Sequence, residues 1–412
     1  MARDSSTVNV ELRPITEDEH AHWSTLIGRA FGADNSEENI AAWLKLTELD
    51  RTIAAFDGGE IVGTAGAFTF EMALPGGATL PAAGVTAVSV RSTHRRQGVL
   101  TRMMAHQLDD VASRNEPIAT LTASETPIYG RFGYGLGTQW WGWSMEKDSV
   151  RLTAPSTATG RMRLLEKDDA AKVLPGIRDR IWRRHPGEMQ WTQAWWDDFF
   201  LDQKEHRDGA SERRYAIHES ESGEADGYVA YRAKPKWENG LPVGSANIVH
   251  LYGFDDEIEA ALFEYLLALD LTKNINGWDR PVDEPLRWRM ADYRRMKVSQ
   301  VGDHLWVRIL DVERSLTARE LSADDRLVIE VHDGFRPQTS GGYVVSPGAC
   351  TRTDEKPDLI MDIRDLGALY LGGISATTLK RAGRVHARTA NAASRADRMF
   401  ASSQTPWCAT HF

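Results

Sequence analysis

The chain has 412 residues and a formal net charge of −10, with 42% apolar and 26% charged residues. This length predicts two or three domains, and the composition is that of a globular protein. The negative charge argues against general nucleic-acid binding, which needs a broad basic surface. No stretch approaches the roughly 18 apolar residues of a membrane span, and residues 1–14 lack the apolar core of a signal peptide. We therefore expect a cytoplasmic protein without a membrane span.

The first third of the chain predicts helices, then antiparallel strands, then a helix and a strand. Apolar residues at helical spacing predict a first helix over Trp23–Phe31. Asn35 and Glu38 are spaced like the capping box of a second helix. The remaining expected elements are a hairpin around 57–59, a strand over 84–90, a helix from about Val99, a strand over 117–124 and a glycine-broken segment over 129–137. This order indicates a mixed α/β layer.

The middle of the chain repeats the same order of elements. Residues 153–160 have the composition of a linker. They are followed by an aromatic-rich helical stretch, a strand pair around 223–227, a strand over 246–254 and a helix over 255–270. This second unit reads as a diverged copy of the first.

A third, smaller α/β unit is expected from about residue 305. Strands are predicted over 305–312, 326–333 and 358–363, and helices over 365–373 and 393–402. The fold class is therefore α/β (α+β).

Residues 88–104, VSVRSTHRRQGVLTRMM, join an apolar strand, three basic residues, a glycine and an amphipathic helix. A helix N-terminus has unpaired N–H groups and the positive end of the helix dipole, which suits a phosphate. Gly98 allows close approach of the backbone, and Arg95 and Arg96 can add charge-assisted bonds. The pattern predicts a pyrophosphate site; a solvated basic turn is the alternative. At the same junction of the second copy stand three acidic residues, 255–257, which would repel an anion.

Other motifs for phosphate, metal or hydrolytic chemistry are absent. The sequence has no GxxxxGK[ST], HExxH or GxSxG, and its GYGLG stretch lacks the third glycine of a dinucleotide site. The two cysteines, Cys350 and Cys408, and the twelve histidines show no metal-ligand spacing. We expect no bound metal and no disulfide framework.

Four stretches resemble the enhanced intracellular survival (Eis) family of GCN5-related N-acetyltransferases (GNATs), over essentially the whole chain. They are residues 88–103, 121–135 (LTASETPIYGRFGYG), 369–373 (LYLGG) and 409–412 (ATHF). The chain departs from the usual GNAT motif at Leu100. The resemblance implies a catalytic GNAT domain, a second GNAT-like domain without cofactor and a sterol-carrier-like domain. We expect these domains at 1–152, 153–304 and 305–412.

The same resemblance implies roles for individual residues, with acetyl-CoA as the acyl donor. The backbone of Val88, Ser89 and Val90 should bond the pantetheine arm. The pyrophosphate should be held by Arg96, Gln97, Gly98, Val99, Leu100 and Thr101, with Arg95 added by the charge of the turn itself. Ser124 and Glu125 should close over the cofactor. Tyr129 matches the general acid, and the terminal carboxylate of Phe412 matches the general base.

The chemistry of these two groups leaves alternatives open. A phenol with a pKa near 10 can protonate a thiolate whose acid has a pKa of about 8.5, but Tyr129 could equally be a packed core tyrosine like Tyr134. An α-carboxylate is ordinarily a weak base, so Phe412 could instead orient the substrate ammonium. The tail could also dock through its apolar residues alone.

The acceptor is expected to be a small cationic amine. The family implies aminoglycosides, and related polyamine or lysine-type acceptors fit the same chemistry. Acidic and aromatic residues could line the acceptor site, namely Trp23, Asp34, Glu37 and Trp43, although the acidic residues also suit a capped helix start. His411 stands where the family has an acidic residue. The resemblance also implies a homo-oligomer, a hexamer, and the rival function is a non-catalytic acyl-CoA or lipid sensor.

Overall fold

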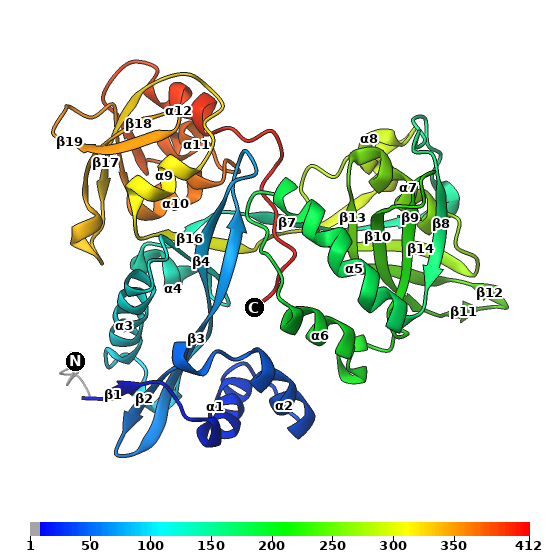
Figure 1. The fold of residues 1–412 in the computed structure, drawn as a ribbon, viewed down its shortest axis with the longest axis horizontal. Helices are drawn as coiled ribbons and strands as arrows, with labels where there is room; N and C mark the ends of the chain where they lie inside the picture. Colours follow the sequence, from blue (N-terminus) through cyan, green and yellow to red (C-terminus); the bar gives the residue numbers. More distant parts are fainter. Residues whose placement is uncertain (1–8) are drawn as a thin grey trace. The chain divides into compact units, whose positions relative to one another are not determined.

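The computed structural model describes residues 9–412, and its chain forms two compact units (Figure 1). Unit 1 contains Met1–Thr138, His304–Ser403 and Thr410–Phe412. Unit 2 contains Gln139–Asp303 and Gln404–Ala409. Residues 1–8 lie outside the described residues. They belong to residues 1–14, in which the sequence shows no signal-peptide pattern. The domain boundaries expected at 152/153 and 304/305 stay predictions. Each compact unit combines segments that are distant in sequence, so the units do not test boundaries drawn along the chain.

Unit 1 is built on a seven-stranded sheet with the order β1-β2-β3-β4-β5-β16-β6. Its strands are β1 (Glu11–Arg13), β2 (Ile53–Asp57), β3 (Glu60–Ala73), β4 (Thr79–Val90), β5 (Ile118–Thr122), β16 (Leu305–Ile309) and β6 (Gly135–Leu136). The predicted hairpin is confirmed, because β2 and β3 pair antiparallel on either side of Gly58 and Gly59. Strands β4 and β5 are parallel.

Helices cover both faces of this sheet, as the alternation of its side chains requires. Helix α1 (Glu17–Ala30) packs on one face and helix α3 (Val99–Ser113) on the other. The α1 face buries Ala54, Phe56, Ile61, Trp23 and Ile27. The α3 face buries Ile53, Ala55, Val62, Val99 and Met103. Neighbouring residues of β2 and β3 thus serve opposite cores.

The second helix, α2 (Glu37–Leu46), forms as predicted, but its cap differs. Ser36 is the N-cap, and its hydroxyl accepts a hydrogen bond from the backbone N–H of Asn39. The predicted cap, Asn35, instead donates its amide to the carbonyl of Ser24. The capping-box assignment to Asn35 and Glu38 was therefore wrong by one position, because Asn35 is used to join the two helices.

A strand predicted to open the third unit lies elsewhere. Residues Leu305–Ile309 form β16, which inserts between β5 and β6 of the first sheet. Sequence alternation identifies a strand but does not identify its partner. The true third sheet has the order β19-β18-β17-β20-β21. Its strands are β19 (Ala349–Thr353), β18 (Gly341–Ser346), β17 (Leu327–His332), β20 (Leu359–Asp362) and β21 (Val385–Ala387).

Four helices accompany the third sheet within unit 1. They are α9 (Val312–Ala318), α10 (Ile363–Tyr370), α11 (Ala376–Arg381) and α12 (Ala392–Phe400). A buried ion pair joins this part to the first sheet, since the Arg308 guanidinium on β16 lies 2.6 Å from the Asp333 carboxylate. Phe132 and Phe335 pack edge to face beside it, with ring centres 5.0 Å apart. The third sheet therefore supports the segment that follows β5.

Unit 2 repeats the topology of the first sheet. Its order is β15-β7-β14-β13-β10-β9-β8, with β13 and β14 parallel. The strands are β8 (Arg161–Leu165), β9 (Arg214–Glu219), β10 (Ala225–Lys234), β13 (Gly244–Gly253), β14 (Thr272–Arg280), β7 (Gln139–Glu146) and β15 (Lys297–Asp303). A separate short pair is formed by β11 (Trp237–Glu238) and β12 (Leu241–Pro242). The predicted duplication is confirmed, with β7 and β16 in equivalent places of the two sheets.

The helices of unit 2 are α5 (Lys167–Ile181), α6 (Gln193–Leu201), α7 (Asp256–Leu267) and the short α8 (Leu286–Arg289). The acidic start of α7 caps the helix, because the Asp255 carboxylate accepts from the N–H groups of Glu257 and Ile258. Residues 153–160 contain no helix or strand, as expected of a linker. The segment Gln404–Ala409 also packs in this unit, where the Ala409 N–H donates to Glu188.

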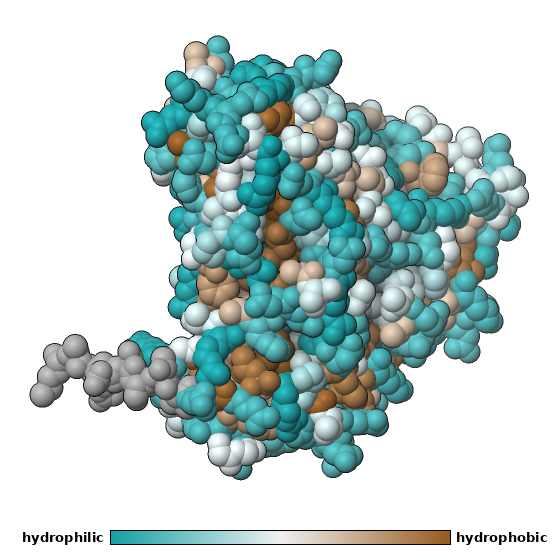
Figure 2. Space-filling model, turned by 60° about the vertical axis from the view of Figure 1, so that its left-hand side comes forward, coloured by the Kyte–Doolittle hydropathy of each residue, from teal (hydrophilic) through white to brown (hydrophobic). Residues whose placement is uncertain are grey.

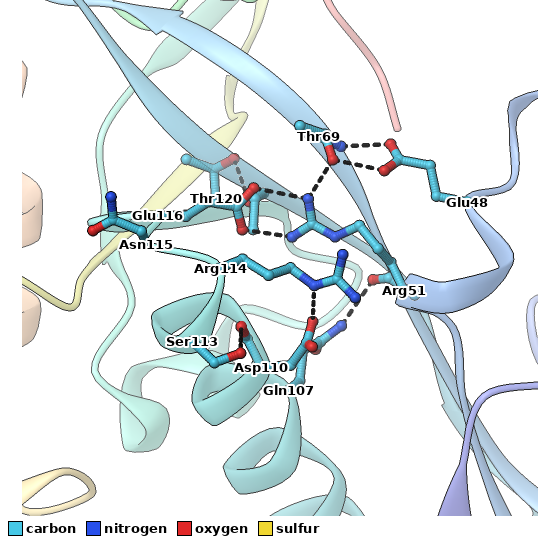
Figure 3. Close-up of polar contacts among 12 residues, drawn as sticks. Glu48, Arg51, Thr69, Gln107, Asp110, Ser113, Arg114, Asn115, Glu116 and Thr120 are labelled. Atoms are coloured by element: carbon cyan, nitrogen blue, oxygen red, sulfur yellow. Dashed lines mark hydrogen bonds and ion pairs between the residues drawn. The ribbon is translucent and has the colours of Figure 1, made fainter.

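A buried ion pair in unit 1 ties the start of β2 to the start of β5 (Figure 3). Two Arg51 nitrogens donate to the Glu116 carboxylate at 2.8 and 2.6 Å, and both side chains are at most 5% exposed. Arg51 also donates to Thr69, which Glu48 holds from the other side. Burial raises the pKa of Glu116, and the Arg51 guanidinium acts in the opposite direction. The pair therefore depends on both partners.

No helix in the part of the chain from residue 9 onward has the length and apolar character to cross a bilayer. The face drawn in Figure 2 is mostly hydrophilic, with separate small hydrophobic patches. Cys350 and Cys408 are both buried thiols.

Candidate active site

The site begins where two parallel strands separate. Strands β4 and β5 pair only between 82–84 and 118–120. Beyond this point β5 continues to pair with β16, whereas β4 has no partner on that side. A gap therefore opens at the carboxyl ends of β4 and β5. The segments that follow these strands, residues 94–98 and 124–131, form its two walls.

This gap is a cleft of about 800 Å³. It brings together every residue predicted to hold the cofactor except Gln97, whose side chain donates to the carbonyl of Thr93. The lining residues on the β4 side are Val88, Ser89, Val90, His94, Arg95, Arg96, Gly98, Val99, Leu100 and Thr101. Those on the β5 side are Ser124, Glu125, Ile128, Tyr129 and Arg131, and Ala30 and Phe31 come from the end of α1.

The start of α3 has the donors that an anion requires. Its N-cap is Gly98, which adopts φ 81° and has no side chain, and no side chain caps the first turn. The first N–H groups of the helix are thus left for a ligand. Arg96 also has a left-handed backbone, φ 64°, which costs a non-glycine residue on the order of 1 kcal/mol. Within residues 9–412, neither Arg95 nor Arg96 forms an ion pair with a carboxylate.

This donor set fits a pyrophosphate. Unpaired N–H groups and two arginines without carboxylate partners are what a doubly charged group needs at a helix N-terminus. The equivalent turn in unit 2 cannot serve in this way, because Asp255 already occupies the N–H groups of α7.

A bulge in β4 shapes the inner end of the cleft. The β3–β4 register shifts between Thr64 and Gly66, and Ala87 on β4 adopts a left-handed backbone with φ 57°. The Thr64 hydroxyl fixes this bulge, with its oxygen 2.7 Å from the Ala87 carbonyl and 2.8 Å from the Ser89 hydroxyl. A bulge leaves backbone groups outside the ladder. Thr86, Ala87 and Val88 line a second, smaller cavity of about 230 Å³.

Tyr129 lines both the cleft and the smaller cavity. It closes the short helix α4 (Thr126–Tyr129), and its side chain is largely buried. Burial raises the pKa of the Tyr129 phenol, while a hydrogen bond with Ser124 acts to lower it. Tyr134 packs edge to face against it at 6.1 Å, is fully buried and lines neither cavity. The two tyrosines, which the sequence could not distinguish, thus occupy different environments.

The chain end lines the smaller cavity as well. The Thr122 hydroxyl donates a 3.1 Å hydrogen bond to a terminal oxygen of Phe412. The Phe412 ring packs against Phe70, with ring centres 5.2 Å apart. Both partners belong to unit 1, as does Phe412 itself. A phenol and a carboxylate therefore border one small cavity at the inner end of the cleft.

The residues predicted to bind the acceptor are dispersed. Trp23 is 1% exposed and stacks on Trp43 at 5.6 Å in the α1 core, and neither lines the two cavities. Asp34 and Glu37 are exposed around the start of α2. The exposed His411 lies against His304, with ring centres 4.5 Å apart. Their roles in acceptor binding stay predictions.

Several residues that line the cleft or the smaller cavity were not predicted from the sequence. Phe31 is predicted as part of the apolar stripe of the first helix, yet it is 53% exposed and lines both cavities. The sequence feature that could have indicated its exposure is its position at the C-terminal end of that stripe. Arg131 lies within the GRFGYG stretch, where no charge role was assigned, and Thr122 is an ordinary strand residue. Nothing in the sequence relates Thr122 to the chain end.

Comparison with protein families accounts for most of the chain. Residues 11–137 and 187–309 each match an acetyltransferase (GNAT) domain, and residues 312–409 match a sterol carrier protein domain. These matches confirm the predicted fold class of two GNAT domains followed by a sterol-carrier-like domain.

Full-length relatives give the family. An uncharacterized N-acetyltransferase of Streptomyces avermitilis is 41% identical, covering 97% of this chain and 99% of that protein. The N-acetyltransferase Eis of Mycobacterium tuberculosis is 31% identical, with coverages of 96% and 98%. The crystal structure of Eis1 from Mycobacterium abscessus has a TM-score of 0.89 at 32% identity, with coverages of 98% and 100%. The chain therefore belongs to the Eis family of GNAT N-acetyltransferases.

Proposed function

We propose that the protein transfers the acetyl group of acetyl-CoA to a primary amine, with Tyr129 as general acid and the Phe412 carboxylate acting on the amine. The observation that carries this proposal is the shared cavity of Tyr129 and Phe412 at the inner end of the cleft. The outer end of the same cleft contains the start of α3 and two arginines. An acyl donor with a phosphate end and a reactive thioester end could bind with its phosphates at the outer end and its thioester at the inner end.

In the proposed binding mode, the pyrophosphate lies at the N-terminus of α3, near Arg95, Arg96 and Gly98. The pantetheine arm follows the unpaired edge of β4 at Val88, Ser89 and Val90, where backbone groups are available. Ser124 and Glu125 border the arm from the β5 side. Gln97, Val99, Leu100 and Thr101 complete the phosphate-binding turn through their backbone.

The reaction forms a C–N bond and breaks the C–S bond of the thioester. The leaving thiolate needs a proton, and the attacking amine loses one. Because burial raises the pKa of Tyr129, its phenol remains protonated at neutral pH and can donate to the sulfur. The bulged backbone at Ala87 and Val88 offers N–H groups near the reacting carbonyl.

The Phe412 carboxylate is proposed to receive the amine. A carboxylate attracts an ammonium group, and in a small, partly enclosed cavity it can accept the proton or pass it to water. The Thr122 hydrogen bond would hold this carboxylate beside the cavity that both residues line. A side-chain base is thus replaced by the end of the chain.

The proposed acceptors are aminoglycosides or related polyamine and lysine-type amines. The exposed carboxylates Asp34 and Glu37 favour a cationic acceptor. Trp43 on α2 is half-buried and could contact the acceptor, whereas the buried Trp23 would support it by stacking. His411, in place of an acidic residue, offers a weaker anchor for a second amine.

The test is thiol release from acetyl-CoA across a panel of amines, namely aminoglycosides, linear polyamines, lysine and simple alkylamines. Amine-dependent thiol release and an acetylated amine in the mass spectrum would support the proposal. Acetyl-CoA binding without turnover on any amine would contradict it and favour the non-catalytic acyl-CoA or lipid sensor. A cytoplasmic location and a homo-oligomer, a hexamer by family resemblance, complete the proposal.

A further inference from the structure

Arg131 lies on the opposite wall of the cofactor cleft from Arg95 and Arg96. It belongs to the turn Gly130–Phe132, which follows α4 and therefore the end of β5. Arg95 and Arg96 come from the segment that follows β4. All three line the same cleft, at the place where β4 and β5 have separated. The cleft thus has cationic groups on both walls.

The charge of Arg131 is uncompensated. Its side chain is exposed and, within residues 9–412, it forms no ion pair with a carboxylate. Many other arginines of this acidic chain are paired; Arg91, just outside the cleft, lies 3.5 Å from Glu60. An exposed arginine without a partner is available to an anionic ligand.

Arg131 is also supported. Its guanidinium carbon lies 4.7 Å from the centre of the Phe132 ring. Phe132 is itself buried and packs against Phe335 at 5.0 Å, so the platform under the guanidinium belongs to the core. Stacking on an aromatic ring reduces the freedom of a guanidinium and leaves its N–H donors for a ligand.

Acetyl-CoA carries two separate anionic groups, the pyrophosphate and the 3′-phosphate of its ribose. The pyrophosphate has a suitable site on the β4 wall, at the start of α3 with Arg95 and Arg96. The 3′-phosphate is a monoester, whose charge at pH 7 is about −1.5 to −2. A guanidinium is well suited to bind such a group through two parallel hydrogen bonds.

We propose that Arg131 binds the 3′-phosphate of acetyl-CoA and thereby selects CoA thioesters over those of 3′-dephospho-CoA and pantetheine. This inference rests on the proposed function, since it assumes that the cleft binds acetyl-CoA. Arg131 is thus a specificity-determining residue for the donor. Tyr129, two residues earlier in the sequence, acts at the thioester end of the donor, whereas Arg131 acts at the nucleotide end.

A rival location for the 3′-phosphate is a cavity of about 380 Å³ lined by Arg29, Arg91 and Arg95. This cavity shares Ala30, Ser89, Val90 and Arg95 with the cleft, so its location alone does not separate the two sites. The charges do: Arg91 is paired with Glu60 at 3.5 Å, whereas Arg131 has no carboxylate partner within residues 9–412.

The experiment measures the Kd of CoA and of 3′-dephospho-CoA by calorimetry for the full-length protein and its variants. The wild type is expected to bind CoA at least about tenfold more tightly than dephospho-CoA, as a charge-assisted contact provides. Arg131→Ala should weaken CoA binding by that factor and change dephospho-CoA binding less than about twofold, so the preference disappears. Arg131→Lys should retain part of it.

Two matched variants separate the alternatives. Arg96→Ala should weaken both ligands equally and keep the preference, as expected of a pyrophosphate contact. Arg91→Ala should change neither ligand. Equal loss for both ligands in Arg131→Ala would overturn the 3′-phosphate assignment, and so would loss of the preference in Arg91→Ala. A wild type that binds CoA without any preference overturns this inference alone. A wild type that binds no CoA overturns the proposed function as well.

Discussion

The Thr122 hydroxyl donates a hydrogen bond of 3.1 Å to a terminal oxygen of Phe412, across 290 positions of sequence. Thr122 is the last residue of β5, and the next residues along the chain, Ala123 and Ser124, line the smaller cavity. The end of the chain is thereby fixed at the place where Tyr129 borders the same cavity. This contact gives a free carboxylate a defined position, which a mobile tail would lack.

Arg96→Ala is expected to weaken acetyl-CoA binding by about 1.5–3 kcal/mol, the range of a hydrogen bond to a charged group. Arg96 has no carboxylate partner within the described part of the chain, so its loss should not destabilise the fold. Calorimetric titration with acetyl-CoA measures the effect, with Arg91→Ala as the control. Unchanged affinity in a folded Arg96→Ala protein would refute the pyrophosphate site.

Tyr129→Phe is expected to lower kcat by roughly a hundredfold or more, as loss of a general acid does, with little change in acetyl-CoA affinity. Tyr134→Phe is the matched control, because the buried Tyr134 hydroxyl has no hydrogen-bond partner within residues 9–412. Steady-state thiol release measures both. Normal turnover in Tyr129→Phe would return Tyr129 to a packing role.

The pH profile adds a second check on Tyr129. Burial raises the pKa of its phenol above the ordinary value of about 10. The acid is protonated below that pKa and is lost as the pH rises through it. The wild-type kcat should therefore show no decline from this group up to about pH 10.

Arg51→Met is expected to destabilise the protein by about 3–5 kcal/mol, since it leaves the buried Glu116 carboxylate without its partner. Removing the cation should raise the Glu116 pKa further, so this deficit shrinks as the pH falls from 7 toward the ordinary glutamate value of about 4.3. The control is Arg114→Met, whose more exposed pair with Asp50 should contribute at most about 1 kcal/mol. Urea unfolding at pH 7 and 5 measures both, and equal effects of the two variants would contradict the account.

Glu259→Gln is expected to stabilise unit 2 at pH 8. Burial raises the pKa of Glu259 to about 7, so ionising it in the fold costs stability as the pH rises from about 4.3 to 7. Glutamine cannot ionise and can still accept from the Gly253 N–H. The gain in Tm over the wild type should be present at pH 8 and absent near pH 4.5.

Glu257→Gln is the opposite case on the same helix. Arg289 lowers the pKa of Glu257 to about 2, so its contribution to stability is present above the unfolded value and is lost as the pH falls toward 2. This variant should lower Tm at pH 8. A gain in Tm for Glu257→Gln, or none for Glu259→Gln, would contradict these assignments.

The sequence predicted much of the fold and brought together most of the residues that line the cleft, because the information there is local. Hydrophobic alternation identifies β4 and β5, and the Arg-Arg-Gln-Gly turn before α3 carries its own physical rationale. Ten of the twelve predicted cofactor residues lie within residues 88–101, so recognising this one segment finds them together.

Long-range features were beyond sequence reasoning. The pattern of residues 305–309 shows a strand but not that it pairs with β5. Trp23 was predicted to line an acidic acceptor pocket with Asp34, Glu37 and Trp43; it is buried in the α1 core, and its role in acceptor binding stays a prediction. The contact between Phe412 and Thr122 joins residues 290 positions apart, and no local sequence pattern predicts it.

The most direct test of the central claim compares the native-ended protein with one extended by a short C-terminal tag. The extension converts the Phe412 carboxylate into an uncharged internal amide and leaves the residues of α3 untouched. We expect unchanged acetyl-CoA affinity and a fall in amine-dependent thiol release of roughly a hundredfold or more. Removal of His411 and Phe412 should give the same result. Full thiol release by the tagged protein would contradict the catalytic role of the chain end.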